Sequence, residues 1–187
     1  MKLLITGHTY GLGKAIWDNL NNDHELVGIS RSTGYDLTDH KTVLKVIDMS
    51  IDFDHVLNIC KVDPAQTDIL LGIHQLWDER KKIGKIISIG GLTESFSWNM
   101  IRMAPVHQTS YIGAKHNLAK AHFDLSSIHP YRSQPQSVLI RPLNIGMREN
   151  ERSDEPYLLE SEVVEVIKFA LERNYYLSTI DLRQICS

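Results

Sequence analysis

The sequence is poor in cysteine and has no long run of apolar residues. Cys60 and Cys186 are its only cysteines, and their wide separation fits neither a disulfide framework nor a zinc site. Such cysteine usage is typical of the reducing cytoplasm, which is the expected location. No apolar stretch approaches the roughly 18 residues that mark a membrane-spanning helix, and the N-terminal residues do not have the pattern of a targeting segment. We therefore expect no association with a membrane.

An excess of either charge is also missing. The formal net charge is −3 and the lysines and arginines are spread along the chain, so the basic patch of a nucleic-acid-binding protein is absent. The nine histidines show no metal-ligand spacing, and no metal site is expected. The sequence has no internal repeat, low-complexity tract or domain linker, and 42% of its residues are hydrophobic. We expect residues 1–187 to form a single domain.

The first twenty residues predict a strand, a glycine-rich turn and a helix. The apolar run Leu3–Ile5 leads into Thr6, and Gly7, Gly11 and Gly13 come next, with apolar residues at helical spacing around and after them. Backbone N–H groups of such a turn can bind a pyrophosphate that side chains would obstruct. Glycines also end strands that have no binding function, so the turn alone leaves both interpretations open.

The end of the expected strand 25–30 bears on the choice of cofactor. In dinucleotide-binding folds an acidic residue about 20 residues past the glycines binds the adenosine ribose, whereas an arginine accommodates a 2′-phosphate. Here Arg31 lies between Ser30 and Ser32. The arrangement favours NADP(H), with NAD(H) as the alternative; an arginine solvated at the end of a strand is the interpretation without function.

The segment 33–39 is unusually short. It leaves no room for a helix before a new strand, and Thr38 or Asp39 is expected to cap the helix that follows. Asp36 either accepts a hydrogen bond from an adenine amino group or only forms a turn.

Strands and helices alternate along the rest of the chain. Further strands are expected over 54–61, 85–91, 138–142 and 175–182, with helices between them starting at Asp63 (N-cap) and Pro64 (first helical residue), over 110–126, and around 163–170. This alternation is typical of an α/β, three-layer, doubly wound Rossmann fold whose mainly parallel sheet has about seven strands. The segments 92–109 and 143–160 follow strand ends, where ligands bind in such sheets, so we expect them to line a substrate pocket.

Tyr111 and Lys115 are the candidate catalytic pair. Four residues apart on a helix, the phenol and the ammonium share one face, so the cation can lower a phenol pKa that is ordinarily about 10. A tyrosine and a lysine at this spacing also occur on many helices as a surface pair.

Three motifs now stand in order on the expected elements: T-G-x-x-x-G-x-G at 6–13, Asp36-Leu37 after a strand, and Y-x-x-x-K at 111–115. Together they resemble the short-chain dehydrogenase/reductase family, over nearly the whole chain and most of all its compact members. The resemblance implies that Tyr111 donates a proton to a substrate carbonyl, or accepts it in the reverse direction, and that Lys115 holds the nicotinamide ribose. It also implies a small carbonyl or alcohol substrate and a homodimer or homotetramer.

The same resemblance implies a set of cofactor contacts. Besides Tyr111 and Lys115, they comprise Gly7, Thr9, Tyr10, Gly11, Leu12 and Gly13 around the pyrophosphate, Ser30, Arg31 and Ser32 near the adenosine ribose, Asp36 and Leu37 at the adenine, Asn58, Ile59 and Cys60 after the third strand, and Pro142 and Ile145 at the nicotinamide amide.

Gly91 is the first of three departures from the family pattern. It stands where the catalytic serine is due, and Ser88 is expected to point elsewhere. A hydroxyl of the next loop could substitute, with Thr93 as the candidate catalytic residue and Ser95 or Ser97 as alternatives. Without a substitute, the loss would cost on the order of 3 kcal/mol of transition-state stabilisation.

The other departures concern Lys61 and the fourth helix of the family. Lys61 replaces a glycine, and its side chain either turns to solvent, as we expect, or lies near the ligand as an anion-binding group. The family's structural asparagine is not evident, and His74 is the nearest polar candidate. His8 and His107 either line the pocket or are solvated.

The sequence therefore predicts an NADP(H)-dependent oxidoreductase that interconverts a carbonyl and an alcohol. A protein that kept the cofactor cleft without turnover, as a sensor or scaffold, is the alternative, and Gly91 and Lys61 favour it. A nucleotide-sugar isomerase or dehydratase ranks below both, because little sequence follows the last strand.

Overall fold

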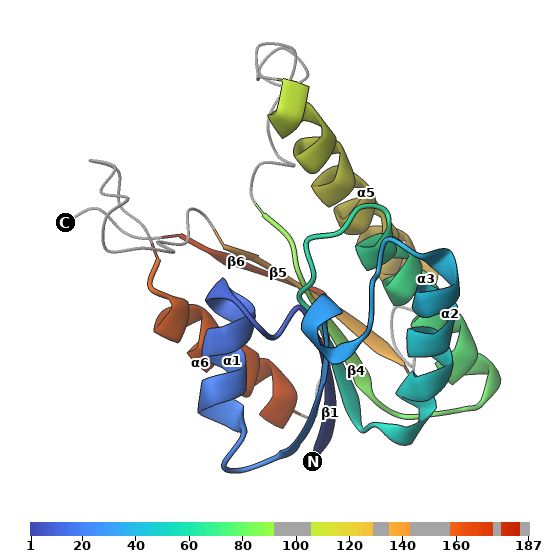
Figure 1. Ribbon diagram of the computed structural model, residues 1–187, viewed down its shortest axis with the longest axis vertical. Helices are drawn as coiled ribbons and strands as arrows, with labels where there is room; N and C mark the ends of the chain where they lie inside the picture. Colours follow the sequence, from blue (N-terminus) through green and yellow to red (C-terminus); the bar gives the residue numbers. More distant parts are fainter. Residues whose placement is uncertain (92–105, 129–134, 143–157, 174–176, 184–187) are drawn as a thin grey trace.

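The computed structural model describes residues 1–91, 106–128, 135–142, 158–173 and 177–183, which form one parallel sheet with helices on both faces (Figure 1). In chain order the elements are β1 (Lys2–Thr6), α1 (Gly11–Leu20), β2 (Glu25–Ile29), α2 (His40–Met49), β3 (His55–Asn58), α3 (Ala65–Glu79), β4 (Lys85–Ile89), α5 (Val106–Ile128), β5 (Gln136–Pro142), α6 (Glu160–Glu172) and β6 (Thr179–Leu182). Short 3₁₀ turns cover Arg31–Thr33 and Ser50–Asp52. None of the helices in the described ranges has the length and apolarity needed to cross a bilayer.

The strand order is β2-β1-β3-β4-β5-β6, and every neighbouring pair is parallel. The chain therefore moves outward from β1 to β2 and then returns to the other side of β1, which confirms the doubly wound α/β fold. The crevice beyond the carboxyl ends of β1 and β3 lies where the winding direction reverses, and this is the usual ligand position in such sheets.

Two apolar cores separate the sheet from its helices. Helices α1 and α6 cover one face and α2, α3 and α5 cover the other (Figure 1). The helices supply buried residues at helical spacing, for example Leu12, Ile16 and Leu20 from α1 and Ile69, Ile73 and Trp77 from α3. Burial of such side chains stabilises the fold by roughly 1.5–3 kcal/mol each relative to exposure. The three-layer arrangement expected from the alternation is thus confirmed.

The described sheet has six strands, close to the seven expected, and the segment after β2 forms a turn. Gly34, with φ of 85°, ends the 3₁₀ turn at Arg31–Thr33. The Asp36 carboxylate then accepts hydrogen bonds from the N–H and hydroxyl of Thr38, at 3.0 and 2.8 Å. These side-chain bonds hold the segment in a turn.

The helix caps show one confirmed and one wrong prediction. Asp39 is the N-cap of α2 and accepts from the N–H of Lys41, as one of the two expected alternatives. At α3 the helix begins one residue later than predicted, with Pro64 rather than Asp63 as the N-cap and no side-chain cap bond. The carbonyl of Val62 accepts from Gln66 N at 3.0 Å instead, so a backbone group takes the place of the carboxylate.

His122 of α5 is a buried base in the core between the sheet and its outer helices. Its side chain is 3% exposed, and neither ring nitrogen has a hydrogen-bond partner among the described residues. Burial, with a smaller contribution from nearby His74 of α3, lowers the pKa of His122 to about 3. The imidazole is therefore neutral in the folded protein at ordinary pH.

This burial predicts a loss of stability in mild acid. The unfolded chain has the ordinary histidine pKa of about 6.5, so it binds a proton that the folded chain excludes, and stability falls as the pH drops below that value. Between pH 7 and pH 5 the free energy of unfolding should fall by about 2 kcal/mol through His122 alone. Chemical denaturation of the protein and of His122→Leu at both pH values measures this. The variant should lose about 2 kcal/mol less than the parent, while His40→Leu, at an exposed position, should behave like the parent. Equal losses in all three proteins would contradict the assignment.

Candidate functional site

The turn between β1 and α1 depends on its glycines. Gly7 and Gly11 have φ of 75° and 52°, in the left-handed region that favours glycine. A Cβ on Gly13 would lie only 2.0 Å from the carbonyl oxygen of Gly7, so no other residue allows α1 to start this close to the strand. Tyr10, the exposed N-cap of α1, makes no side-chain cap bond to the first N–H groups of the helix. The turn has the conformation of a pyrophosphate cradle, and the residues present fit that group.

His8 closes this turn against β2. Its ring packs on Trp17 with 4.7 Å between centroids, and it covers Gly28, where a Cβ would lie 2.4 Å from a ring carbon. Burial lowers the pKa of His8 below its ordinary value, partly offset by a hydrogen bond to the Ile29 backbone. The His8 ring is therefore half-buried, and it packs within the turn. Thr9 is exposed beside it, and Leu12 is buried in the core.

The end of β2 presents a guanidinium and hydroxyls. Thr33 Oγ1 accepts from the Ser30 N–H at 3.0 Å and donates to the Gly28 carbonyl at 3.1 Å, which fixes the 3₁₀ turn. The Ser30 and Ser32 hydroxyls lie 2.8 Å apart, and Arg31 is exposed beside them. The three residues predicted near the adenosine ribose are therefore brought together.

Asp36 and Leu37 follow, and only Asp36 has an exposed side chain. The hydrogen bonds from the Thr38 N–H and hydroxyl, with a smaller contribution from Arg31, hold the pKa of Asp36 below its ordinary value. Leu37 is 6% exposed and belongs to the core. Its side chain therefore packs under the turn, and a contact with an adenine would have to use its backbone.

A hydrogen-bond network joins β1 to β3 where the crevice begins. Thr6 Oγ1 accepts from the N–H groups of Ile59 and Cys60 at 3.0 and 3.1 Å, and it donates to Asn58 Oδ1 at 3.3 Å. Burial raises the pKa of the Cys60 thiol, so it is neutral and a poor nucleophile. The predicted residues 58–60 therefore lie at the bottom of the crevice, bonded to the end of β1 through Thr6.

Lys115 is held at the bottom of the crevice by a residue that the sequence analysis missed. Its side chain is 5% exposed, and its ammonium donates to Gln66 Oε1 at 2.8 Å and to the Ile89 carbonyl at 2.7 Å. Gln66 in turn donates from Nε2 to the carbonyls of Asn58 and Ile89, at 2.8 and 3.1 Å. One signal existed in the sequence: Gln66 precedes Ile69 and Leu70 on the buried face of α3, where a polar residue requires a partner.

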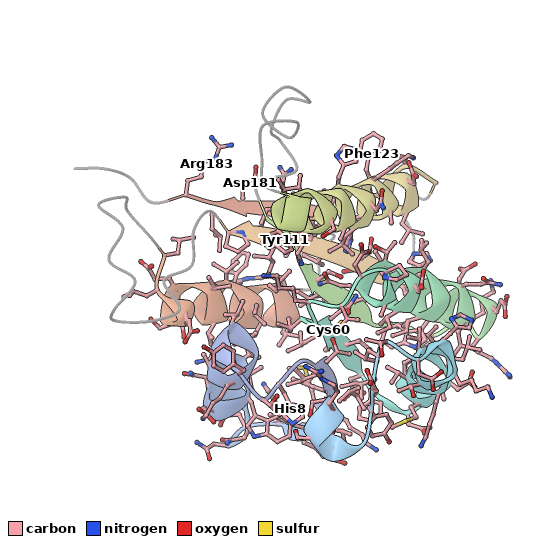
Figure 2. The ribbon with its side chains drawn as sticks, turned by 45° about the horizontal axis from the view of Figure 1, so that its top comes forward. His8, Cys60, Tyr111, Phe123, Asp181 and Arg183 are labelled. Carbon is pink, nitrogen blue, oxygen red and sulfur yellow. The ribbon has the colours of Figure 1, made fainter. Side chains whose placement is uncertain are left out.

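Tyr111 is half-buried above this network. Two cations lie near its ring: Lys115 of the same helix and Lys61 of the segment after β3. Lys115 Nζ is 5.7 Å from the centroid of the Tyr111 ring, which confirms that the two side chains share one face of α5. Lys61 Nζ is closer, 4.3 Å from the centroid. In Figure 2, Cys60 lies between His8 of the glycine turn and Tyr111. The glycine turn follows β1 and the helix of Tyr111 and Lys115 comes after β4, so both lie on the side of the sheet where the parallel strands end.

A pocket of about 170 Å³ opens beside Tyr111. It is lined from the segment after β3 and from the starts of α3 and α5, by Lys61, Val62, Asp63, Gln66, Thr67, Ser110, Tyr111, Ala114 and Lys115. The volume is below the roughly 300 Å³ at which sites for drug-sized ligands begin. The pocket suits a small molecule or one end of a larger one.

The structure shows where the residues that depart from the family pattern lie. Gly91 is buried just after β4. Ser88 points into the strand network, where its hydroxyl accepts from Asn58 Nδ2 at 3.4 Å, so it does not face the pocket. Lys61 is exposed, as expected, and its ammonium also lies over the Tyr111 ring, since the aromatic face attracts a cation. His74 is buried near His122 and does not line the pocket.

Several predicted residues lie outside what the structure describes. Pro142 is buried at the end of β5, but Ile145 and the candidate hydroxyls of Thr93, Ser95 and Ser97 fall in segments that are not described. The same is true of the His107 side chain.

Comparison with known proteins shows similarity in structure only. No family model matches the sequence, and no curated protein matches it. Among solved structures, a short-chain dehydrogenase from Streptomyces avermitilis is 14% identical with a TM-score of 0.69, covering 97% of this chain and 88% of its own. Serine dehydrogenase from Escherichia coli is 13% identical with a TM-score of 0.71 and 97% coverage of both chains. The 3-alpha-hydroxysteroid dehydrogenase from Pseudomonas sp. B-0831, solved with NADH, is 14% identical with a TM-score of 0.68, covering 97% of this chain and 95% of its own. The chain thus has the Rossmann fold of the short-chain dehydrogenases.

Proposed function

We propose that the protein is an NADP(H)-dependent oxidoreductase that interconverts a small carbonyl compound and its alcohol. The observation that carries the proposal is the position of Tyr111 and buried Lys115 at one pocket, in the crevice that the glycine turn also borders. The nicotinamide cofactor of similarly folded dehydrogenases supports it. Consumption of reduced nicotinamide with a broad panel of carbonyl compounds, followed by absorbance, tests the proposal.

The cofactor would be held by residues along the crevice. The turn from Gly7 to Gly13 would bind the pyrophosphate through backbone N–H groups. Arg31 with its neighbouring hydroxyls would meet the ribose phosphate, Asp36 would meet the adenine, and the backbone of 58–60 would form the wall beneath. When bound, the nicotinamide supplies or accepts the hydride.

The chain itself provides the proton chemistry. The Tyr111 hydroxyl would donate its proton to the carbonyl oxygen as the alcohol forms, leaving a tyrosinate. The ammonium groups of Lys61 and Lys115 would stabilise that anion, because opposite charges a few ångströms away favour the ionised form. Gln66 and the Ile89 carbonyl would keep Lys115 in position during the step.

Arg31 predicts a preference for NADPH over NADH. A guanidinium bonded to a 2′-phosphate forms a charge-assisted hydrogen bond worth about 1.5–3 kcal/mol, so Arg31→Ala should weaken NADPH binding about tenfold or more and leave NADH binding unchanged. Fluorescence titration with both nucleotides measures the two affinities. Arg80→Ala, at an exposed position after α3, should change neither. Equal affinity of the parent protein for both nucleotides would contradict the preference.

The second candidate is a protein that binds NADP(H) without turnover. Two observations favour it: Gly91 provides no hydroxyl at the end of β4, and the Lys115 ammonium is already bonded to Gln66 and Ile89. Tight NADPH binding together with no nucleotide consumption across the whole carbonyl panel would support this candidate against the first.

A further inference from the structure

Lys61 and Tyr111 present two different chemical groups to the same small pocket. Lys61 follows β3 on an exposed segment, and its ammonium lies 4.3 Å from the centroid of the Tyr111 ring. Both side chains line the pocket of about 170 Å³. A molecule that brings a carbonyl to the Tyr111 hydroxyl therefore has a cation within reach of its other end.

The charges around the pocket favour a singly charged anion. Lys115 is already bound below the pocket by Gln66 and the Ile89 carbonyl. Lys61 forms no ion pair with a carboxylate within the part of the chain that the structure describes, and contact with an aromatic face does not occupy its N–H donors. The Asp63 carboxylate also lines the pocket and repels a bound anion. This repulsion is weaker for a ligand with one negative charge, such as a carboxylate, than for a ligand with two.

We infer that the substrate of this site is a small carbonyl compound that carries a carboxylate, and that Lys61 binds the carboxylate. That the substrate has a carbonyl group rests on the proposed function, and that it carries a negative charge rests on Lys61 at the pocket. The pocket of about 170 Å³ accommodates a small molecule or the carbonyl end of a larger one. The separation of Lys61 from Tyr111 places the carboxylate near the reacting carbonyl. Lys61 is accordingly a specificity-determining residue, which positions the carbonyl for proton transfer from Tyr111.

Binding of a matched pair of probes tests this without turnover. Pyruvate and 2,3-butanedione have similar size and shape and differ by one negative charge. Ligand-observed NMR on the protein without nucleotide should give a Kd for pyruvate at least tenfold lower than for butanedione. Lys61→Met should raise the pyruvate Kd about tenfold and leave the butanedione Kd unchanged, while Lys61→Arg should retain most of the preference.

The matched control is Lys45, whose ammonium lies 5.0 Å from the centroid of another tyrosine ring, that of Tyr35. Lys45→Met should leave both Kd values unchanged, since it removes the same kind of cation–aromatic contact away from the pocket. Thermal unfolding of each variant shows whether it is folded. Equal Kd values for the two probes, or a pyruvate Kd that Lys61→Met does not change, would overturn the inference. Inorganic phosphate binding tenfold tighter than pyruvate would also overturn it.

Kinetic measurements separate this inference from the proposed function. With NADPH present, reduction of pyruvate whose KM rises in Lys61→Met, with no such rise for a neutral ketone, would support both. Charge-selective pyruvate binding without reduction of any carbonyl would support the carboxylate site and refute the oxidoreductase. Reduction of neutral ketones with no preference for keto acids would refute the carboxylate site alone.

Discussion

Replacing Tyr111 with phenylalanine is expected to lower the rate of carbonyl reduction by about 10²–10⁴-fold, the usual contribution of a positioned general acid. The ring and its contacts with Lys61 and Lys115 would remain, since both cations lie over the ring face. NADPH binding and the free energy of unfolding should therefore change little. Steady-state kinetics, nucleotide titration and chemical denaturation of the same preparation measure the three quantities.

Tyr35→Phe is the matched control for this prediction. Tyr35 is also half-buried beside a lysine, but its hydroxyl contacts the Met49 sulfur at 3.6 Å, away from the pocket. Its removal should leave the rate unchanged. A Tyr111→Phe protein that binds NADPH and reduces carbonyls at the parent rate would show that another group supplies the proton.

Gly13→Ala is expected to abolish measurable NADPH binding and to destabilise the protein. The added Cβ would lie 2.0 Å from the Gly7 carbonyl oxygen, which is backbone, so the strand and the start of α1 must move apart. Forcing such a contact typically costs 1–3 kcal/mol, and the displaced N–H groups would no longer converge on a pyrophosphate. Fluorescence titration and chemical denaturation check the two effects.

Gly113→Ala provides the comparison for added volume. A Cβ there meets no atom within 4 Å among the described residues outside the backbone of its own helix, and alanine favours a helix over glycine by about 1 kcal/mol. This variant should therefore be at least as stable as the parent. If Gly13→Ala keeps the parent affinity for NADPH, the glycine turn is not the cofactor cradle.

The sequence predicted best what depends on local periodicity. The glycine turn, the buried faces of α1 and α3 and the alternation of strands and helices all follow from residues within one or two turns of each other, and the structure confirms them. The spacing of Tyr111 and Lys115 is of the same kind, because four residues make about one helical turn.

Contacts between distant segments could not be predicted in this way. Gln66 bonds to Lys115, which is 49 positions later, and only the packing of α3 beside α5 brings the two together. The direction of the Lys61 side chain likewise depends on a distant residue, because its ammonium lies over the Tyr111 ring. At Asp36 the sequence left two interpretations open, and the structure shows the carboxylate accepting the hydrogen bonds of a turn from Thr38.

Transfer of deuterium from NADPH labelled at C4 of the nicotinamide tests the central claim most directly. The protein is incubated with the labelled nucleotide and a panel of carbonyl compounds that includes keto acids and neutral ketones, and the products are analysed by mass spectrometry. The account predicts an alcohol with deuterium on its carbinol carbon, which forms about 10²–10⁴-fold more slowly when Tyr111→Phe replaces the parent protein. Saturating NADPH binding with no deuterated product from any member of the panel would contradict it.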